Sequence, residues 1–311
     1  MSGEEFKRRL LKYNTPRRII QLLSFIFFSA AIFNLGVLPL LFPVLWTWGL
    51  KTNVSGDAFT AIQLMLSGWN ATAVFPWLAL ASFLIVGILI GKALCGWICP
   101  FGFIQDLLGF VRRKQTDVSV RTHHSMIYVK YAILGIVLFI SMTFSAAQVL
   151  GRAAGYQTAL GIFAIAPFTI LSPSETLFAT LPRMIHDFRF AVVQPNFDFF
   201  AGFSSLSPLF WIQIAIMVGV LVFAAYVPRS WCRYFCPHGA FMAIMNRFSF
   251  IGLRREPFKC EKAGCGACVQ VCPTRVPILD LPWEKFSDSE CIYCMKCVDA
   301  CENKAIKLTY P

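Results

Sequence analysis

Eight of the twelve cysteines lie near the C-terminal end of the chain, in two regularly spaced quartets that each contain the run C-x2-C-x3-C. Three thiolates on one short loop can hold three corners of a [4Fe-4S] cube. In chains with two such motifs, the fourth ligand of each cube comes from the other motif. The spacing therefore predicts one cluster on Cys260, Cys265, Cys268 and Cys301, and a second on Cys291, Cys294, Cys297 and Cys272.

Two simpler explanations of these cysteines fit less well. A structural zinc site usually takes its four ligands as two separated pairs, whereas here the cysteines are grouped in quartets. A disulfide framework is typical of small secreted domains and does not suit a 311-residue chain that is 57% hydrophobic. The gap between Cys260 and Cys265 is longer than usual, and Gly264 and Gly266 give that loop backbone freedom.

The other four cysteines form two C-x3-C-P motifs, Cys95 with Cys99 and Cys232 with Cys236. The surrounding sequences CGWICPFG and CRYFCPHG match, which indicates an internal repeat. The spacing predicts both thiols of a pair on one face of a helical turn. Three roles are open for these thiols: a shared site for another metal centre, pairs that cycle between dithiol and disulfide, or structural packing. Buried free cysteine often packs as a small hydrophobe, but the repetition favours a functional role.

The composition indicates a membrane protein. Only 14% of the residues are charged, whereas soluble domains are about one quarter charged. The formal net charge of +12 falls before residue 255, because residues 255–311 carry equal numbers of acidic and basic side chains. The charge is therefore expected to reflect membrane topology, and no nucleic-acid partner is expected.

Four segments are long and apolar enough to be transmembrane helices. They are Ile19–Leu45, Phe75–Leu94, Met126–Val149 and Leu209–Val227. The segment Leu160–Leu171 is apolar but too short to span, and is expected to be re-entrant, interfacial or a packed loop. Sixteen Lys and Arg residues flank one side of the four spans and four flank the other. Both termini are therefore predicted to be cytoplasmic, in a multi-pass protein of the inner membrane whose first span is not cleaved.

The predicted fold is a membrane α-helical bundle of four transmembrane helices, built as a two-fold repeat, with a small α+β ferredoxin domain that binds two clusters. The expected domains are a basic cytoplasmic arm at residues 1–18, a four-span membrane domain at 19–254 with both C-x3-C-P motifs, and the double-cluster domain at 255–311.

The sequence assigns no catalytic residue. Haem is not expected, because none of the four histidines lies in the middle of a predicted span. A quinone site needs a proton acceptor beside an apolar pocket, and each candidate acceptor is also consistent with ordinary loop solvation. These candidates are Asp106, His123, His124, Glu175, His186 and Asp187.

The predicted spans, the paired C-x3-C-P motifs and the double quartet together resemble the NapH/MauN family of membrane ferredoxin-type proteins, whose core is similar to those of NosR and CcoG. The resemblance covers residues 19–311. It implies an electron-transfer subunit of a quinol-linked oxidoreductase in a respiratory complex. Its partners would be membrane lipid, quinone or quinol, and other redox subunits of the ferredoxin, cytochrome or reductase type. The alternatives are a maturation or repair reductase for a metal or thiol of a client enzyme, and a transmembrane dithiol relay.

Overall fold

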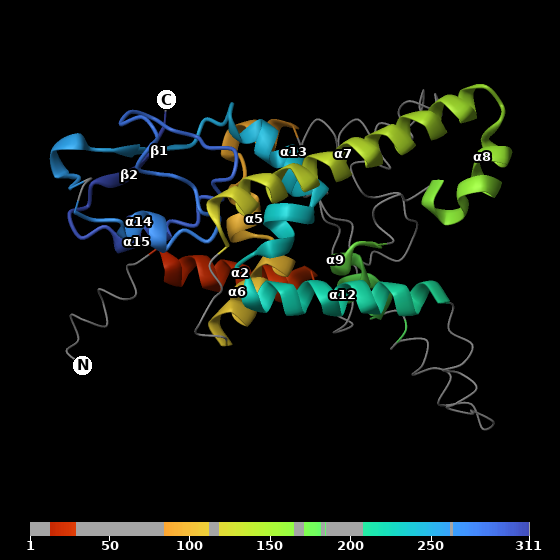
Figure 1. Ribbon diagram of the computed structural model, residues 1–311, viewed down its shortest axis with the longest axis horizontal. Helices are drawn as coiled ribbons and strands as arrows, with labels where there is room; N and C mark the ends of the chain where they lie inside the picture. The colour runs from red at the N-terminus through yellow and green to blue at the C-terminus, as the bar shows by residue number, and fades with distance from the viewer. Residues whose placement is uncertain are drawn as a thin grey trace. The chain divides into compact units, whose positions relative to one another are not determined.

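The computed structural model describes residues 13–28, 84–111, 118–164, 171–181, 184, 208–261 and 264–310, and these residues are mostly helical (Figure 1). The chain divides into two compact units. The first unit is Met1–Phe27, Leu84–Leu134 and Ala224–Pro311, and the second is Phe28–Phe83 and Gly135–Phe223. All twelve cysteines belong to the first unit, so the candidate site is built within it.

Two helices are long and apolar enough to cross a membrane: residues 121–149 of α7 (Val120–Val149), and α12 (Pro208–Tyr226). With a rise of about 1.5 Å per residue, the 19 residues of α12 match the thickness of a bilayer's hydrocarbon core. Large apolar side chains such as Phe139 and Val222 are exposed on them, as contact with lipid requires. The third and fourth predicted spans are thus helices of membrane-spanning length.

Residues 29–45 of the first predicted span (Ile19–Leu45) and residues 75–83 of the second (Phe75–Leu94) lie outside the described residues, as do residues 165–170 of Leu160–Leu171. Their described ends are helical, at α2 (Asn14–Phe28) and at residues 84–90. The remaining described elements of the second unit are short. They are α8 (Ala153–Leu160), the 3-10 helix η1 (Gly161–Ala164), α9 (Pro173–Glu175) and the π-helix η3 (Thr176–Thr180).

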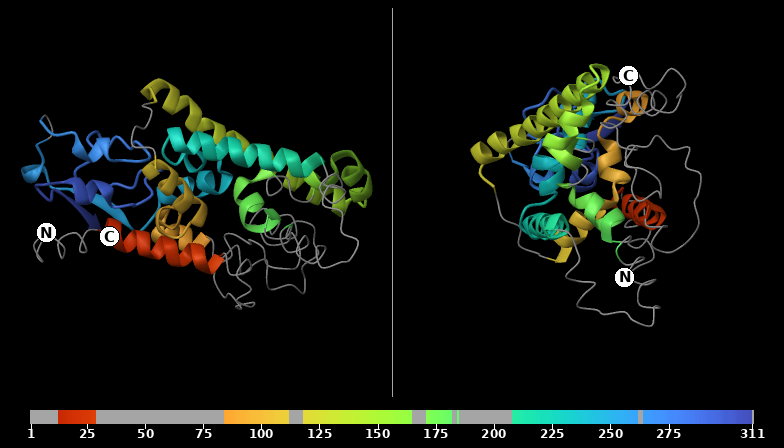
Figure 2. Two further views of the ribbon diagram at one scale, coloured as in Figure 1. Left: turned by 90° about the horizontal axis from the view of Figure 1, so that it is seen from below. Right: turned by 90° about the vertical axis from the view of Figure 1, so that its right-hand side faces the viewer.

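Helix α2 buries polar side chains and exposes apolar ones. Arg17 and Gln21, one helical turn apart, are fully buried, whereas Ile19 and Leu23 are more than half exposed. A helix on the surface of a soluble domain shows the opposite pattern, with its apolar stripe facing the core. The exposed face of α2 therefore suits an apolar surrounding such as lipid. Figure 2 shows α2 running beside α6, and the Phe25 and Phe103 rings lie 5.8 Å apart.

Each C-x3-C-P motif lies at a junction between two helices. The short helix that holds the first cysteine ends before the second cysteine, and a new helix begins at the proline. The pairs are α5 (Ala93–Trp97) with α6 (Pro100–Val111), and the π-helix η4 (Trp231–Phe235) with α13 (Pro237–Asn246). Proline is favoured at the first helical position but disfavours a helical residue before it, and Cys236 is accordingly extended. The expectation that both thiols of a pair share one helical turn is therefore wrong.

The C-terminal tail is a small α+β structure. Strand β1 (Gly252–Arg255) pairs antiparallel with β2 (Ile306–Thr309), and the chain between them forms η5 (Pro257–Lys259), α14 (Ala267–Gln270) and α15 (Lys296–Ala300). The two short helices lie side by side (Figure 1). The core beneath them is mainly apolar, and its non-cysteine members are Leu253, Val276, Ile278, Phe286, Tyr293, Met295 and Ile306.

Gly96 allows the α5 helix to touch the tail. A Cβ atom at Gly96 would lie only 2.1 Å from the carbonyl oxygen of Ile292, and the indole Nε1 of Trp97 donates a 2.7 Å hydrogen bond to the carbonyl of Tyr293. The loop between Cys291 and Cys294 is therefore packed directly against the helix that carries Cys95.

Replacing Gly96 with alanine is expected to lower the free energy of unfolding by about 1–3 kcal/mol, because the new methyl group overpacks this contact. The measurement is thermal unfolding of the purified protein in detergent. Gly135→Ala is the control, because no atom lies within 4 Å of a Cβ atom there, and alanine in a helix interior is expected to be neutral or mildly stabilising. Equal unfolding temperatures for the two variants would contradict the close contact.

Candidate functional site

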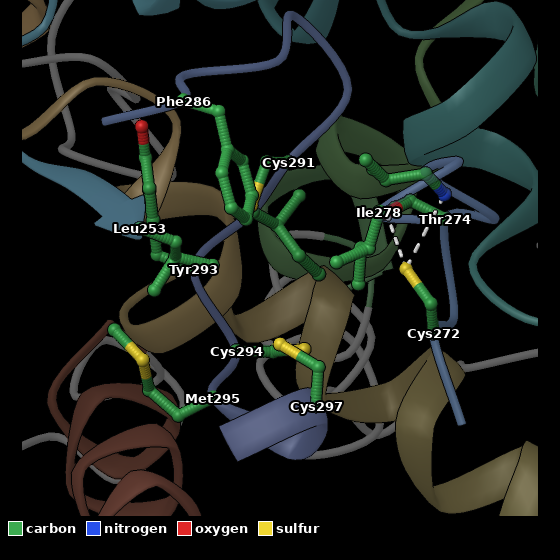
Figure 3. A pocket seen from close by; sticks show the side chains of 12 residues that line it. Leu253, Cys272, Thr274, Ile278, Phe286, Cys291, Tyr293, Cys294, Met295 and Cys297 are labelled. Carbon is green, nitrogen blue, oxygen red and sulfur yellow. Dashed lines mark hydrogen bonds between the residues drawn. The ribbon is translucent and has the colours of Figure 1, made fainter. Parts of the chain in front are cut away.

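The four cysteines predicted to hold the second cluster line one pocket in the tail (Figure 3). They are Cys272, Cys291, Cys294 and Cys297. The remaining wall is largely apolar and includes Leu253, Ile278 and Phe286. Cys272 lies after α14, and the other three lie before and within α15. The fold thus brings the last cysteine of one motif to the three leading cysteines of the other, as interleaved ligation requires.

The sulfur of Cys272 accepts hydrogen bonds from the tail itself. The backbone N–H of Val276 donates to it at 3.4 Å, and the Thr274 hydroxyl lies 3.5 Å away (Figure 3). Hydrogen bonds of this kind, together with burial, set the reduction potential of an iron–sulfur cluster. Burial also raises the pKa of the Cys294 thiol above its ordinary value, so metal coordination would be needed to hold this sulfur as a thiolate.

The cysteines predicted to hold the first cluster are grouped at the more exposed end of the tail. Cys260 and Cys265 are close enough to Cys268 to interact with it electrostatically. Cys301 caps the end of α15, which packs on the α14 helix that carries Cys268. The Cys301 sulfur accepts a 3.2 Å hydrogen bond from the N–H of Ala305. Because Cys265 is exposed, this end of the tail is open to solvent.

The four thiols of the tail pocket offer the ligand set of a [4Fe-4S] cube. Across the described segments, no three His, Cys, Asp or Glu side chains are close enough together to hold one metal ion. A structural zinc needs four ligands about 2.0–2.3 Å from one point, whereas a [4Fe-4S] cube spreads its thiolates over four iron corners. Four cysteines that surround a shared pocket match the second requirement.

The thiols of the two C-x3-C-P motifs converge although the motifs are far apart in the sequence. Cys99 and Cys232 hydrogen-bond to each other, which lowers the pKa of Cys232 and raises that of Cys99. Cys95 and Cys236 both interact electrostatically with Cys232 and with each other. Cys95, Cys99 and Cys232 are buried, and Cys236 is half-buried.

Three of these four sulfurs accept a hydrogen bond from a nearby N–H group. The N–H of Gly102 donates to Cys99 and the N–H of Gly239 donates to Cys236, each at 3.4 Å. The side chain of Gln105 donates to Cys232 at 3.3 Å. Each glycine is the third residue after its cysteine, so both motifs form the same hydrogen bond between a glycine N–H and the second cysteine of the motif. The repeated letters CPFG and CPHG were the sequence signal for these glycines, but their role was not predicted.

Asp106 is a partly buried ion-pair partner rather than a free proton acceptor. It accepts hydrogen bonds from Arg17 at 3.1 Å and from Arg229 at 2.9 and 2.7 Å. Burial would raise the pKa of the Asp106 carboxyl, but the charges and hydrogen bonds of Arg229 and the charge of Arg17 hold it well below its usual range. The Arg229 guanidinium also donates to the carbonyl of Cys95 at 2.7 Å, so this network braces the first C-x3-C-P motif.

A second buried carboxylate, Glu290, links the tail to two helical segments. It immediately precedes Cys291 and accepts a 2.9 Å hydrogen bond from Lys92, just before α5, and bonds from Lys130 in α7. Neither of these ion-pair networks was predicted from the sequence, because their partners are distant along the chain.

The first unit buries more cations than its ion pairs neutralise. Among the described residues of this unit, five Lys or Arg side chains are at most 1% exposed, namely Arg17, Lys92, Lys130, Arg229 and Arg233. The buried ion pairs that the structure describes supply two carboxylates, Asp106 and Glu290. Burying unpaired charge is costly, so additional negative charge nearby would stabilise these cations. Iron–sulfur clusters held by thiolates would supply it: Arg17 interacts with Cys294, and Arg233 with Cys272.

The other proposed proton acceptors are less informative. His123 faces Tyr234 at 3.0 Å and Arg233 at 2.8 Å, and its neighbour His124 is exposed. His186, Asp187 and the side chain of Glu175 lie outside the described residues. A separate apolar pocket of about 210 Å³ lies between the end of the second predicted span and the tail, lined by residues that include Ala93, Leu94, Trp97, Tyr293 and Met295.

Comparison with known proteins agrees with this chemistry. A family model described as a 4Fe-4S binding domain matches residues 72–116 and 209–256, and one described as a 4Fe-4S dicluster domain matches residues 249–311. Each C-x3-C-P motif lies within one of the first two segments. Ferredoxin-type 4Fe-4S domains are therefore present in the chain. No solved structure matches it.

Three relatives illustrate the similarity. The Escherichia coli protein YccM is 26% identical over 72% of this chain and 52% of its own length. The methylamine utilization ferredoxin-type protein MauN of Methylobacillus flagellatus is 24% identical over 70% of this chain and 60% of its own length. The ferredoxin-type protein NapH of Haemophilus influenzae is 24% identical over 73% of this chain and 65% of its own length. The chain thus matches about half to two thirds of each of these relatives.

Proposed function

The chain is a NapH/MauN-like ferredoxin-type protein, and from this premise we propose that it carries electrons between the quinone pool and a partner redox protein at the cytoplasmic face of the membrane. The observation that carries the proposal is the pocket lined by Cys272, Cys291, Cys294 and Cys297, packed against the membrane-proximal helix α5. A [4Fe-4S] cluster, when bound, supplies one-electron chemistry. The protein would serve as an electron-transfer subunit within a respiratory complex.

The residues of the chain hold, insulate and orient the redox centres. Cys260, Cys265, Cys268 and Cys301 would ligate the first cluster, and Cys272, Cys291, Cys294 and Cys297 the second. The apolar wall of the second site excludes water, and Arg17 and Arg233 stabilise negative charge beside it. The first site lies near the exposed Cys265 and the fully exposed side chain of Phe258, which suits electron exchange with a docked partner.

The proposed topology has four spans, a two-fold repeat and both termini in the cytoplasm. The repeat is supported by one family model that matches two segments and by the shared helix–cysteine–proline–helix geometry of the motifs. The first span is supported by the inverted polarity of α2, which suits lipid contact. The excess of Lys and Arg on the tail side supports the orientation.

The proposed quinone site is the apolar pocket at Ala93, Leu94 and Trp97. Its other wall contains Tyr293 and Met295, which flank Cys294 of the second cluster site. Its size and apolar lining suit a hydrophobic ring or the start of an isoprenoid tail. A quinol in this pocket would lie beside a predicted cluster at the depth of the membrane surface.

Reduction by quinol tests the proposal. The iron–sulfur signals of the protein in liposomes are recorded by EPR after anaerobic addition of menaquinol or ubiquinol analogues. Ala93→Trp should fill the pocket and slow this reduction by at least about tenfold, the loss expected when reactants are misplaced. Dithionite should still reduce the variant. Leu107→Trp is the control, because Leu107 is half exposed on α6 and does not line the pocket. Failure of quinols to reduce the wild-type protein would refute the quinone link.

A further inference from the structure

We infer that Cys95, Cys99, Cys232 and Cys236 together ligate a third [4Fe-4S] cluster, separate from the two predicted in the tail. The inference deepens the proposed electron-transfer function, on which it rests for its purpose, but its evidence is the local structure of the two C-x3-C-P motifs. It converts the three roles left open by the sequence into one assignment.

The first support is convergence. Cys99 and Cys232 are hydrogen-bonded, and Cys95 and Cys236 interact with Cys232 and with each other. Each motif contributes one thiol from a short helix and one from the start of the next helix. Two helix junctions therefore bring four thiols close together, which is the ligand number of a [4Fe-4S] cube, and ligation would replace the hydrogen bond between Cys99 and Cys232.

The second support is the set of donors aimed at the sulfurs. The N–H groups of Gly102 and Gly239 donate to Cys99 and Cys236, and Gln105 donates to Cys232. Both glycines are closely approached: an added Cβ atom would lie 3.2 Å from the carbonyl oxygen of Cys95 at Gly102, and 3.0 Å from that of Cys232 at Gly239. Backbone N–H groups at the start of a helix that donate to a cysteine sulfur stabilise its thiolate form. They also help to set the reduction potential of the cluster that the thiolate binds.

Buried cationic side chains beside the four thiols also favour an anionic cluster. Lys92 and Arg229 both interact with Cys95 and Cys232, and both are at most 1% exposed. Their carboxylate partners, Glu290 and Asp106, are shared with Lys130 and Arg17. The ion pairs around the four thiols therefore contain more cationic side chains than carboxylates. A cube held by four thiolates is anionic and would add negative charge beside these buried cations.

A dithiol relay fits these observations less well. Thiol–disulfide exchange requires access for an attacking thiolate, but Cys95, Cys99 and Cys232 are buried. The hydrogen-bonded pair, Cys99 with Cys232, also joins the two motifs rather than the two cysteines of one motif. A shared centre uses all four thiols, whereas one disulfide between these two would leave Cys95 and Cys236 without a role.

The four C-x3-C-P thiols lie beside the predicted second cluster site of the tail, so a centre there could exchange electrons with that cluster. Arg229 interacts electrostatically with both Cys232 and Cys294, so the two sets of thiols share this buried cation. Gly96, next to Cys95, packs on the backbone of Ile292, and Trp97 bonds to the carbonyl of Tyr293. The C-x3-C-P centre would therefore adjoin the second tail cluster and extend the electron path toward the membrane.

The direct test is iron and sulfide analysis of the anaerobically purified full-length protein. About twelve irons per chain are expected for the wild type, and about eight for the variant in which Cys95, Cys99, Cys232 and Cys236 are all replaced by serine. About eight irons in both proteins would overturn the inference. Recovery of a disulfide between these cysteines from the wild type, with about eight irons, would assign them to thiol chemistry instead.

A pair of mild variants covers the case in which the fourfold variant does not fold. Gln105→Met removes the hydrogen bond to Cys232 and the one that the side chain accepts from the N–H of Trp231, and Thr274→Val removes the hydroxyl beside Cys272. Neither substitution changes the charge. In a redox titration followed by EPR, Gln105→Met should shift the potential of one of three clusters, and Thr274→Val that of a different one. If the titration resolves only two clusters, or if Gln105→Met shifts the same cluster as Thr274→Val, the third cluster is refuted. Because neither assay uses quinol, failure here leaves the proposed quinol reaction separately testable.

Discussion

Replacing Asp106 with asparagine is expected to lower the free energy of unfolding by about 3–5 kcal/mol, the range for a buried ion pair that loses one partner. Asp106 bonds to both Arg17 and Arg229, and both guanidinium groups are fully buried. The asparagine side chain keeps the shape but leaves two buried cations without their counter-charge. Unfolding in detergent, followed by circular dichroism, measures the loss.

Glu256→Gln is the matched control for this variant. Glu256 pairs with Lys259 and Lys307 at 2.8 and 2.6 Å, but both lysines are about half exposed. Exposed ion pairs contribute little to stability, so the control should unfold close to the wild type. If both variants unfolded alike, the buried network around Asp106 would have no special structural role.

Asp106→Asn should also differ from the wild type in its response to acid. The pKa of Asp106 lies below its usual value in the folded protein. Its stabilising effect is therefore complete above the ordinary aspartate pKa and is lost as the pH falls through the lower folded value. Asp106→Asn has no carboxylate to protonate at this site and should therefore lack this loss of stability in acid. The difference in the free energy of unfolding between the wild type and the variant should shrink as the pH falls.

Replacing Cys294 with alanine is expected to remove the second tail cluster and about four irons per chain. Cys294 is 7% exposed and lines the pocket with Cys272, Cys291 and Cys297, so no solvent ligand can readily replace it. Iron analysis and EPR should show the loss of one signal, and quinol-dependent electron delivery to the other tail cluster should fall to background.

Met295→Leu is the control for the cysteine variant. Met295 follows Cys294 in the sequence, lines the same pocket and also carries sulfur, but a thioether is not expected to be a cluster ligand. Leucine has nearly the same volume, so the iron content should stay at the wild-type value. Full iron in Cys294→Ala, or equal loss in both variants, would show that the ligand assignment is wrong.

Much of the local chemistry was readable from the sequence, because cluster ligation and membrane insertion leave short-range signals. The cysteine spacing predicted an interleaved pair of sites, and Cys272 does lie with Cys291, Cys294 and Cys297. The apolar runs predicted α7 and α12 at membrane-spanning length. One prediction from the spacing was wrong, namely that both thiols of a C-x3-C-P motif lie on one helical turn. Pro100 and Pro237 each start a new helix after the second cysteine of the motif.

The sequence by itself determined the type of chemistry, because eight thiols at ligand spacing and long apolar runs have few physical explanations. Only the tertiary structure decided which distant groups meet. It brought the two C-x3-C-P motifs together and joined Asp106 to Arg17 and Arg229. It also placed Glu290 between Lys92 and Lys130. Such pairings leave no periodic pattern in a single sequence, because they depend on how helices cross and on which charges must be neutralised once water is excluded.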